Sequence, residues 1–450
     1  MSVLAVNKEE TGTLAAPVTR LERVLSLDVL RGFALLGILV LNIQDFASPA
    51  GILHDIPLNV VSQTGRHHSL DVVIMTIQWL FFEGKMRALF AALFGAGTVL
   101  LLERIEHRSG AGAAADVFHR RNMWLVLFGL IHGVLIWDGD ILLYYALLAL
   151  LVLYPLRSVA GKKLIVAGFA ISLIGGTFGI ANFLDLRSAW PQTVLQEGAH
   201  NAQVHHQVPT PAQSKAVTDA IAKRKSELDA IPKAAADGRR SYWETEPGNA
   251  SSEVGFATML FTSGWVFEVT GMLIAGMGLY KIGFLSARLS SRTYFTIAVM
   301  GYAISLPITL IGLHHSSLFG FSDAVTTVWM YVPYVLEQTA CMLANASIVL
   351  LLIRSGALMP LQRALASVGR TAFSNYILTS LFCQFLFKWG PWKLYGSLEY
   401  YQQIYVVLGV WSLNVIFSTV WLRFFSSGPL EWGWRSLTYW KRQPLLVYNS

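Results

Sequence analysis

The sequence contains little charge and few cysteines, and each shortage excludes a class of protein. Charged residues make up 14% of its 450 residues, whereas ordinary soluble domains carry about 25%. Its two cysteines, Cys341 and Cys383, lie in apolar segments, which argues against a disulfide framework or a cysteine-based metal cluster. We find neither a P-loop nor a Rossmann glycine pattern, and no alternation typical of strands. These absences favour an all-α protein of apolar composition.

Apolar residues dominate the chain instead. They account for 54% of it, and the mean hydropathy is +0.50. The 14 Trp, 16 Tyr and 25 Phe suit aromatic belts at two membrane interfaces. The net charge of +7 does not indicate a nucleic-acid partner, because the basic residues fall mostly in short connections between apolar segments. The composition therefore predicts a polytopic integral membrane protein whose partner is the lipid bilayer.

The apolar segments predict an all-α fold with about ten transmembrane helices and both termini in the cytoplasm. One apolar stretch, residues 70–103, is too long for a single crossing and is interrupted by charged residues at 83–87. We expect a re-entrant or interfacial helix there, then a break and a full span ending at Arg104. The basic residues between 104 and 121 then predict a cytoplasmic loop. Residues 1–19 are too polar for a signal peptide, so we expect the first helix to be retained as an anchor.

One long polar segment, residues 186–253, divides the chain. It contains several Lys and Arg, but loops longer than about 60 residues are exempt from the positive-inside rule, so we place it outside. A single helix is expected over residues 255–280 after it. The expected parts are a cytoplasmic arm (1–23), an N-terminal transmembrane bundle (24–185), an extracytoplasmic polar insert (186–253), a C-terminal transmembrane bundle (254–425) and a cytoplasmic tail (426–450).

The first expected span carries a charged pair near its start. Asp28 and Arg31 are three residues apart, so their side chains share one helix face and can pair. A charge at the bilayer centre costs about 2.5–3.5 kcal/mol, so ionisable residues there usually pair or face a wet cavity. Two interpretations stay open. Either Arg31 extends to the headgroups with Asp28 as its neutralising partner, or the pair contacts a substrate.

The candidate catalytic residues lie toward the outer end of a later span. His132 lies in an apolar helix, where an imidazole can exchange a proton near neutral pH or can simply pack between glycines. Asp138 and Asp140 lie just beyond His132, in the turn that leads to the next expected span. A carboxylate beside an imidazole fixes its tautomer, but aspartate also caps helices. Capping is the expected role of Asp138, and for Asp140 both roles stay open.

Three ionisable residues, Glu83, Lys85 and Arg87, occupy the break in the second apolar stretch. Such residues are costly at membrane depth unless they are paired or hydrated. Glu83 is a candidate catalytic carboxylate. Lys85 and Arg87 are candidates for holding a phosphate, a carboxylate or a developing oxyanion. The alternative is a charge cluster at the outer headgroups.

The ninth expected span is unusually polar, and Asn375 and Tyr376 in it are candidates for substrate contact. Polar stripes of this kind more often join helices. Three His-His doublets do not predict a metal site, because neighbouring residues on a helix point apart. We expect neither a metal nor a tightly bound cofactor.

Several motifs are spread along the chain: SLDVLRGFALLGI from Ser26, FEGKMRALF from Phe82, LFGAG from Leu93, GDILLYYA from Gly139, GRTAFSNY from Gly369 and GPLEWGWR from Gly428. Together they resemble the bacterial YeiB-like membrane family, known as domain of unknown function family 418. The resemblance covers the chain from about Arg20 to Pro444, except for residues 186–253. It implies a multi-pass protein of the bacterial inner membrane.

The Asp-x-x-Arg-Gly opening is also remotely similar to that of transmembrane acyltransferases, which include heparan-alpha-glucosaminide N-acetyltransferase. Asp28, Arg31 and Gly32 match this opening. The similarity implies transfer of an acyl group from cytoplasmic coenzyme A across the membrane through an embedded histidine. We assign that role to His132 because of its depth. The histidines at 54, 67 and 68 are alternatives.

These observations predict a membrane-embedded acyltransferase with acyl-CoA as its co-substrate. His132, oriented by Asp140, would deprotonate an extracytoplasmic hydroxyl or amine on a small molecule, glycan or lipid. The second hypothesis is a transporter or exporter of a small anionic or lipid-like solute, with the same charges as a proton relay. The oligomeric state stays open, a homodimer included.

Overall fold

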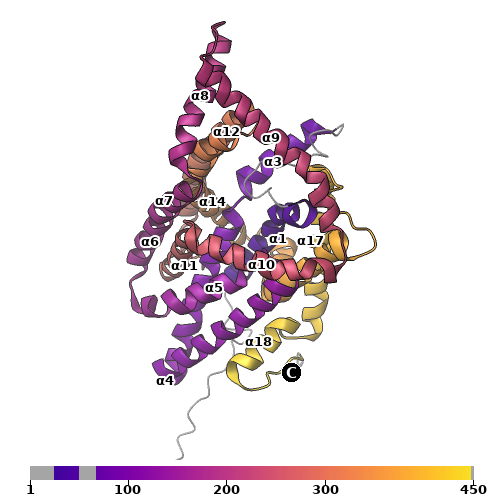
Figure 1. Cartoon of the computed structure of the whole chain (residues 1–450). Coiled ribbons are helices and arrows are strands. Elements are labelled where there is room, and N and C mark those ends of the chain that lie inside the picture. Colours follow the sequence, from indigo (N-terminus) through magenta and orange to yellow (C-terminus); the bar gives the residue numbers. More distant parts are fainter. Residues whose placement is uncertain (1–24, 50–66, 447–450) are drawn as a thin grey trace, which may run out of the picture.

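The computed structural model describes residues 25–49 and 67–446, and these residues form helices joined by short connections (Figure 1). Within them there is no sheet, and one isolated bridge joins Phe425 to Leu446. The predicted all-α class is therefore confirmed. The cytoplasmic arm expected before residue 24 and the alternative histidine His54 lie outside the described residues.

The α-helices are α1 (Leu25–Ala47), α3 (His68–Phe81), α4 (Lys85–Leu135), α5 (Leu142–Leu148), α6 (Gly161–Ala170), α7 (Thr177–Phe183), α8 (Leu186–Val204), α9 (Pro211–Gly238), α10 (Tyr242–Thr262), α11 (Trp265–Lys281), α12 (Ser291–Leu318), α13 (Asp323–Thr326), α14 (Tyr334–Ser355), α15 (Met359–Arg370), α16 (Ala372–Gln384), α17 (Tyr400–Phe424) and α18 (Pro429–Tyr439). Short π-helical turns extend several of them, at Ala149–Leu153, Ile171–Gly176, Thr327–Tyr331 and Phe385–Trp389, and a 3₁₀ turn spans Pro155–Ser158.

Six helical stretches among the described residues are long and apolar enough to cross a membrane. This finding supports a membrane protein, while the count of about ten spans and the side on which each terminus lies stay predictions. The six stretches are Leu25–Ala47, His68–Leu135, Gly161–Phe183, Ser291–Leu318, Tyr334–Ser355 and Tyr400–Phe424.

Glycines allow the central helices to approach one another closely. A Cβ atom on Gly32 of α1 would lie 2.0 Å from the carbonyl oxygen of Leu365 in α15. Similarly, a Cβ on Gly95 of α4 would lie 1.9 Å from the carbonyl oxygen of Leu273 in α11. Small residues at such crossings are typical of membrane helices, in which close packing replaces the hydrophobic effect as the driving force. The α1–α15 and α4–α11 crossings thereby fix the helices that carry the site.

Two connections differ from the sequence prediction, and one agrees with it. The basic residues of 104–121 lie in helix and not in a loop, because α4 consists of two helical stretches that meet at a kink at Gly110, whose φ of 82° suits a residue without a Cβ. The apolar run 255–280 forms two helices, because the backbone is extended at Ser263, next to Gly264, which lies against Gly179. The predicted break in the second apolar stretch is present at Gly84, where φ is 66° and α4 begins.

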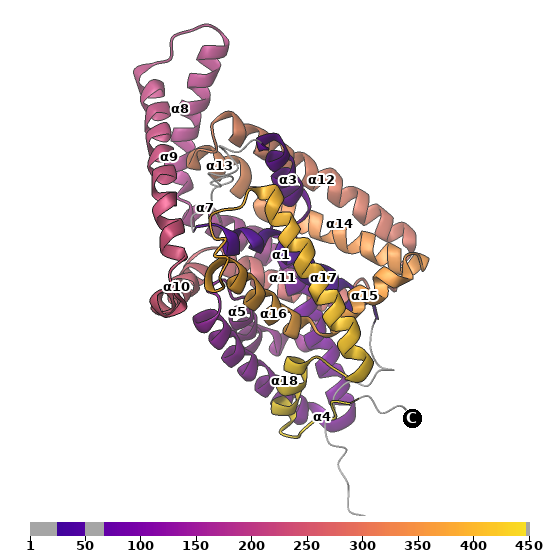
Figure 2. The ribbon, with the colours of Figure 1, turned by 90° about the vertical axis from the view of Figure 1, so that its right-hand side faces the viewer.

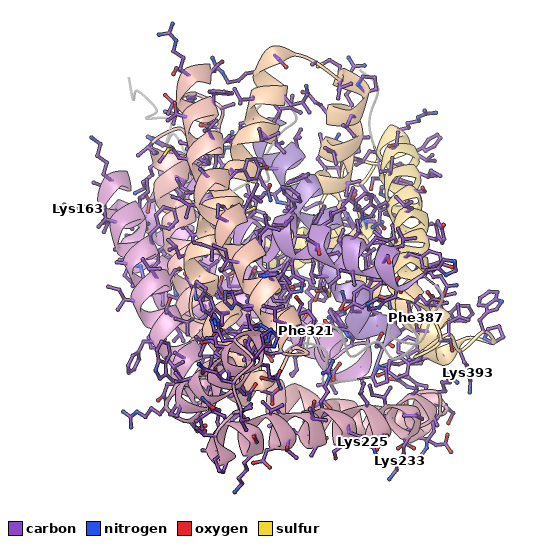
Figure 3. All side chains as sticks on the ribbon, turned by 90° about the horizontal axis from the view of Figure 1, so that it is seen from above. Lys163, Lys225, Lys233, Phe321, Phe387 and Lys393 are labelled. Carbon is purple, nitrogen blue, oxygen red and sulfur yellow. The ribbon has the colours of Figure 1, made fainter. Side chains whose placement is uncertain are left out.

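The polar insert is helical and lies at one end of the molecule. Helices α8 and α9 form a hairpin that projects from the body, whereas α18 lies at the opposite end (Figures 1 and 2). Seen from the hairpin end in Figure 3, Lys225 and Lys233 mark α9 along one edge of the body. Helix α10 begins inside the polar insert and continues past residue 253, where the sequence analysis placed the end of the insert.

Helices α9 and α10 are tied to the rest of the chain by polar contacts. Lys223 of α9 pairs with Asp323 of α13. The guanidinium of Arg239, just after α9, donates to the carbonyl oxygen of Tyr395 at 2.6 Å. The hydroxyl of Tyr242 then donates to a backbone carbonyl oxygen at the end of α4 at 3.1 Å. The last of these contacts places the start of α10 against the end of α4.

Candidate functional site

A buried histidine and a buried aspartate meet at the turn between α4 and α5. His132 lies in the last turn of α4, and Asp140 follows eight residues later, after the chain has reversed. Nδ1 of His132 lies 2.8 Å from Oδ1 of Asp140, and the two side chains are 1% and 0% exposed. A carboxylate on Nδ1 leaves Nε2 as the nitrogen that can accept a proton. Nε2 is buried and has no hydrogen-bond partner among the described residues.

Asp140 performs both of the roles that the sequence left open. Its Oδ2 accepts the backbone N–H of Leu143 at 2.7 Å, which caps the start of α5. Its Oδ1 accepts from His132 and also from the hydroxyl of Tyr376 at 3.2 Å. The rings of Tyr376 and His132 lie 4.8 Å apart between centroids. The cap on α5 therefore holds the carboxylate in place for the imidazole.

A cavity of about 260 Å³ opens beside this group, between α1, α4, α15 and α18. We call it the arginine cavity, because, of the residues that the structure describes, five arginines and two carboxylates line it. The rest of its wall is largely apolar, and Tyr376 belongs to it. The arginines are Arg31, Arg104, Arg121, Arg370 and Arg435, and the carboxylates are Asp28 and Glu431.

The arginines of this cavity are held by specific contacts. Arg31 donates to Oδ1 of Asp28 at 3.1 Å, so the predicted pair forms and lines the cavity. The guanidinium of Arg121 lies 3.7 Å above the ring of Trp434, as in a cation–π contact. Burial lowers the pKa of Arg435 and raises the pKa of Glu431, both on α18 outside the candidate spans. Because burial disfavours the charged Arg435, an anionic ligand would stabilise that charge.

A second cavity, of about 170 Å³, lies toward α10. We call it the aromatic cavity, because Trp79, Trp137, Trp265, Tyr334 and Tyr400 are among its lining residues. Glu83 and Arg87 also line it.

Each of these two charged residues has a defined partner. Glu83 accepts a hydrogen bond from the hydroxyl of Tyr334 at 3.0 Å. Arg87 lies 3.0 Å from the carboxylate of Glu268, which is 1% exposed. Asp45 of α1 lines the aromatic cavity as well, so its wall presents one paired guanidinium and two carboxylates to a ligand.

His132 and Asp140 are not among the lining residues of either cavity, and Tyr376, which contacts both of them, is their link to the arginine cavity. Two further residues that the sequence singled out also lie outside both walls. Lys85 is fully buried, and its Nζ lies 2.8 Å from the carboxylate of Glu337, 252 residues away. The amide of Asn375 donates to the hydroxyls of Thr371 and Ser418 at 2.9 and 2.8 Å, so it joins α16 to α17. Both side chains are thus engaged in packing the helices.

The structure adds residues that the sequence analysis did not assign. Arg370 and Arg435 belong to recognisable motifs, yet only the fold brings them to the cavity that also contains Arg31. Tyr145 lines both cavities and lies in the motif that begins at Gly139. Over residues 25–49 and 67–446, no group of three or more His, Cys, Asp and Glu side chains gathers as a metal site would require.

Known proteins resemble this chain over nearly its whole length. Residues 279–441 match the family model described as "Protein of unknown function (DUF418)". "Uncharacterized protein YeiB" of Escherichia coli (strain K12) is 30% identical over 441 residues, which cover 96% of this chain and 100% of that protein. "Uncharacterized protein YxaH" of Bacillus subtilis (strain 168) is 28% identical over 435 residues, with coverage of 95% and 97%. No solved structure matches the chain.

Proposed function

We propose that this chain, which belongs to the YeiB-like DUF418 family, is an acyltransferase embedded in the bacterial cytoplasmic membrane. It would move an acyl group from cytoplasmic acyl-CoA to an extracytoplasmic hydroxyl or amine. One observation carries the proposal. A buried imidazole has its Nδ1 on a carboxylate and an Nε2 without a hydrogen-bond partner within residues 25–49 and 67–446, and its ring packs on Tyr376, which lines a phosphate-suited cavity.

The arginine cavity suits the acyl donor. Guanidinium groups bind phosphate oxygens in a bidentate way, and CoA carries several phosphates. The apolar part of the wall, with Phe90, Phe94 and Phe373, suits a thioester and its acyl chain. We place this cavity on the cytoplasmic side, since basic residues gather there as the positive-inside rule expects.

The transfer step requires one base and one acid. The acceptor O–H or N–H attacks the thioester carbonyl carbon while Nε2 of His132 takes its proton. The C–S bond then breaks, and the imidazolium returns the proton to the leaving thiolate, so the products are the acylated acceptor and CoA. Asp140 stabilises the imidazolium in between. Glu83 and Arg87 would contact the acceptor from the aromatic cavity.

Transport of a small anionic or lipid-like solute is the second candidate. It is favoured by the ion pairs Lys85–Glu337 and Arg87–Glu268, which are buried among the helices. Intramembrane ionisable residues mark proton relays as well as catalytic sites. In a transporter the two cavities would be alternating ends of one solute path.

Binding of acetyl-CoA to the detergent-solubilised protein tests the proposal. Arg31→Ala should weaken binding about 10- to 100-fold, because a hydrogen bond to a charged group contributes about 1.5–3 kcal/mol. Arg363→Ala is the matched control, since this exposed arginine lies on α15 but not in the cavity wall. His132→Ala should bind normally but release CoA about 10²- to 10⁴-fold more slowly. If the protein binds no acyl-CoA and instead supports solute-driven proton flux in liposomes, the acyltransferase proposal fails and the transporter hypothesis takes its place.

A further inference from the structure

The two cavities meet at a single side chain. Tyr145 is the one described residue that lines both the arginine cavity and the aromatic cavity. It lies in α5, two residues after Leu143, whose backbone N–H donates to Asp140, and it is 2% exposed. Tyr145 therefore lies between the two cavities.

Contacts from both sides hold the Tyr145 ring in this position. Its hydroxyl donates to the carbonyl oxygen of Arg87, a residue of the aromatic cavity, at 3.1 Å. Its ring contacts Phe90 and Phe94 of the arginine cavity, with centroids 6.3 and 5.9 Å apart. The hydrogen bond thus anchors the ring on one side and the phenylalanines pack against it on the other.

We infer that Tyr145 is a specificity-determining partition between donor and acceptor in the proposed transfer. This inference rests on the proposed function. The ring keeps water of the aromatic cavity away from the thioester in the arginine cavity, and its displacement by an acceptor lets the acyl carbon and the nucleophile meet. Excluding water in this way prevents hydrolysis of a reactive acyl group.

The tyrosine suits this role better than a smaller side chain would. A phenol is rigid, with two rotatable side-chain bonds, and it blocks a passage at low entropic cost. Losing it would join the cavities and admit water to the thioester. Water then replaces the acceptor: its oxygen bonds to the acyl carbon, the C–S bond breaks, and the products are the free carboxylic acid and CoA.

A thiol-accessibility experiment tests the partition without relying on acyl transfer. Thr98→Cys is placed in the arginine cavity of a Cys341→Ala/Cys383→Ala protein, so that Phe90 and Phe94 still pack against Tyr145, and the protein is studied in sealed proteoliposomes of defined orientation. A membrane-impermeant anionic methanethiosulfonate is added to one face at a time. With Tyr145 present, the thiol should react from one face only, and Tyr145→Ala should add reaction from the other face.

Matched variants separate a partition from general loosening of the fold. Tyr144→Ala is the control, because this neighbouring tyrosine lines only the aromatic cavity. Tyr145→Phe keeps the ring, so its thiol should again be labelled from one face only. If the Tyr145→Ala protein fails to fold, Tyr145→Leu takes its place. Labelling from both faces with Tyr145 intact, or equal labelling in the Tyr144 and Tyr145 alanine variants, would overturn the inference.

Acetyl-CoA turnover then links the partition to the chemistry. Tyr145→Ala, with its phenylalanines intact, should release CoA without added acceptor faster than the parent and Tyr144→Ala proteins. If the parent neither binds nor turns over any acyl-CoA, the acyltransferase proposal fails, while the labelling pattern still decides the partition. If Tyr145→Ala admits the reagent but leaves acceptor-independent CoA release unchanged, the partition stands as a barrier and its role in excluding water is refuted.

Discussion

Replacing Asp140 with asparagine changes one carboxylate oxygen into a donor and leaves the shape of the side chain unchanged. Asp140 now accepts three hydrogen bonds, from His132 and Tyr376 on Oδ1 and from the backbone of Leu143 on Oδ2. Asparagine can accept on only one side. If its oxygen stays with Leu143, its NH₂ group faces Nδ1, and the imidazole proton must move to Nε2. The nitrogen that should act as the base is then blocked.

The expected effects follow from these contacts. In a serine-protease triad the same substitution lowers kcat about 10⁴-fold by favouring the wrong tautomer, and we expect a loss of that order here. One buried donor left without an acceptor should also lower the free energy of unfolding by about 1–3 kcal/mol. Release of CoA from acetyl-CoA measures the first effect, and thermal unfolding in detergent measures the second.

Asp138→Asn is the control, because Asp138 lies in the same turn but does not contact His132 among the described residues. It should leave the rate of CoA release near that of the parent protein. A folded Asp140→Asn protein with a rate within tenfold of the parent, in an assay where His132→Ala is inactive, would refute the tautomer argument.

Two further predictions concern stability. Lys85→Met should lower the free energy of unfolding by about 3–5 kcal/mol, because it leaves the carboxylate of Glu337 buried without its cation. Thermal unfolding should show that adding Glu337→Leu recovers part of this loss. If the effects of the two substitutions were simply additive, the pairing of Lys85 with Glu337 would be contradicted. Gly32→Ala should cost about 1–3 kcal/mol, because its Cβ would lie 2.0 Å from a carbonyl oxygen of α15. Gly97→Ala, whose Cβ would meet nothing within 4 Å, should leave the unfolding temperature nearly unchanged, and equal effects of the two alanines would argue against the tight α1–α15 crossing.

Local geometry explains why parts of the site could be read from the sequence. Asp28 and Arg31 are three residues apart on one helix, so their pairing at 3.1 Å follows from the helical repeat alone. The break at Gly84 was visible because charges interrupt an apolar run there. His132 and Asp140 flank one short turn, which made their contact a reasonable expectation from eight residues of chain.

Errors arose where helix ends depend on packing. The basic residues between 104 and 121 suggested a loop, yet nothing in their composition shows that helical hydrogen bonding continues on both sides of Gly110. Likewise, the apolar run 255–280 has helical composition throughout. The helix is divided at Ser263, whose backbone is extended, where the neighbouring Gly264 packs against Gly179 from a segment far away in the chain.

The sequence by itself determined the class of this protein: its apolar composition requires a bilayer, and in a bilayer backbone groups must be satisfied within helices. The tertiary structure alone decided which charges pair and which remain at a cavity wall. Lys85 and Arg87 are two residues apart, yet helix packing commits Lys85 to Glu337 and brings Arg87 to the aromatic cavity beside Glu268. The helical repeat sets the direction of each side chain, but the close glycine crossings determine which helices these side chains meet.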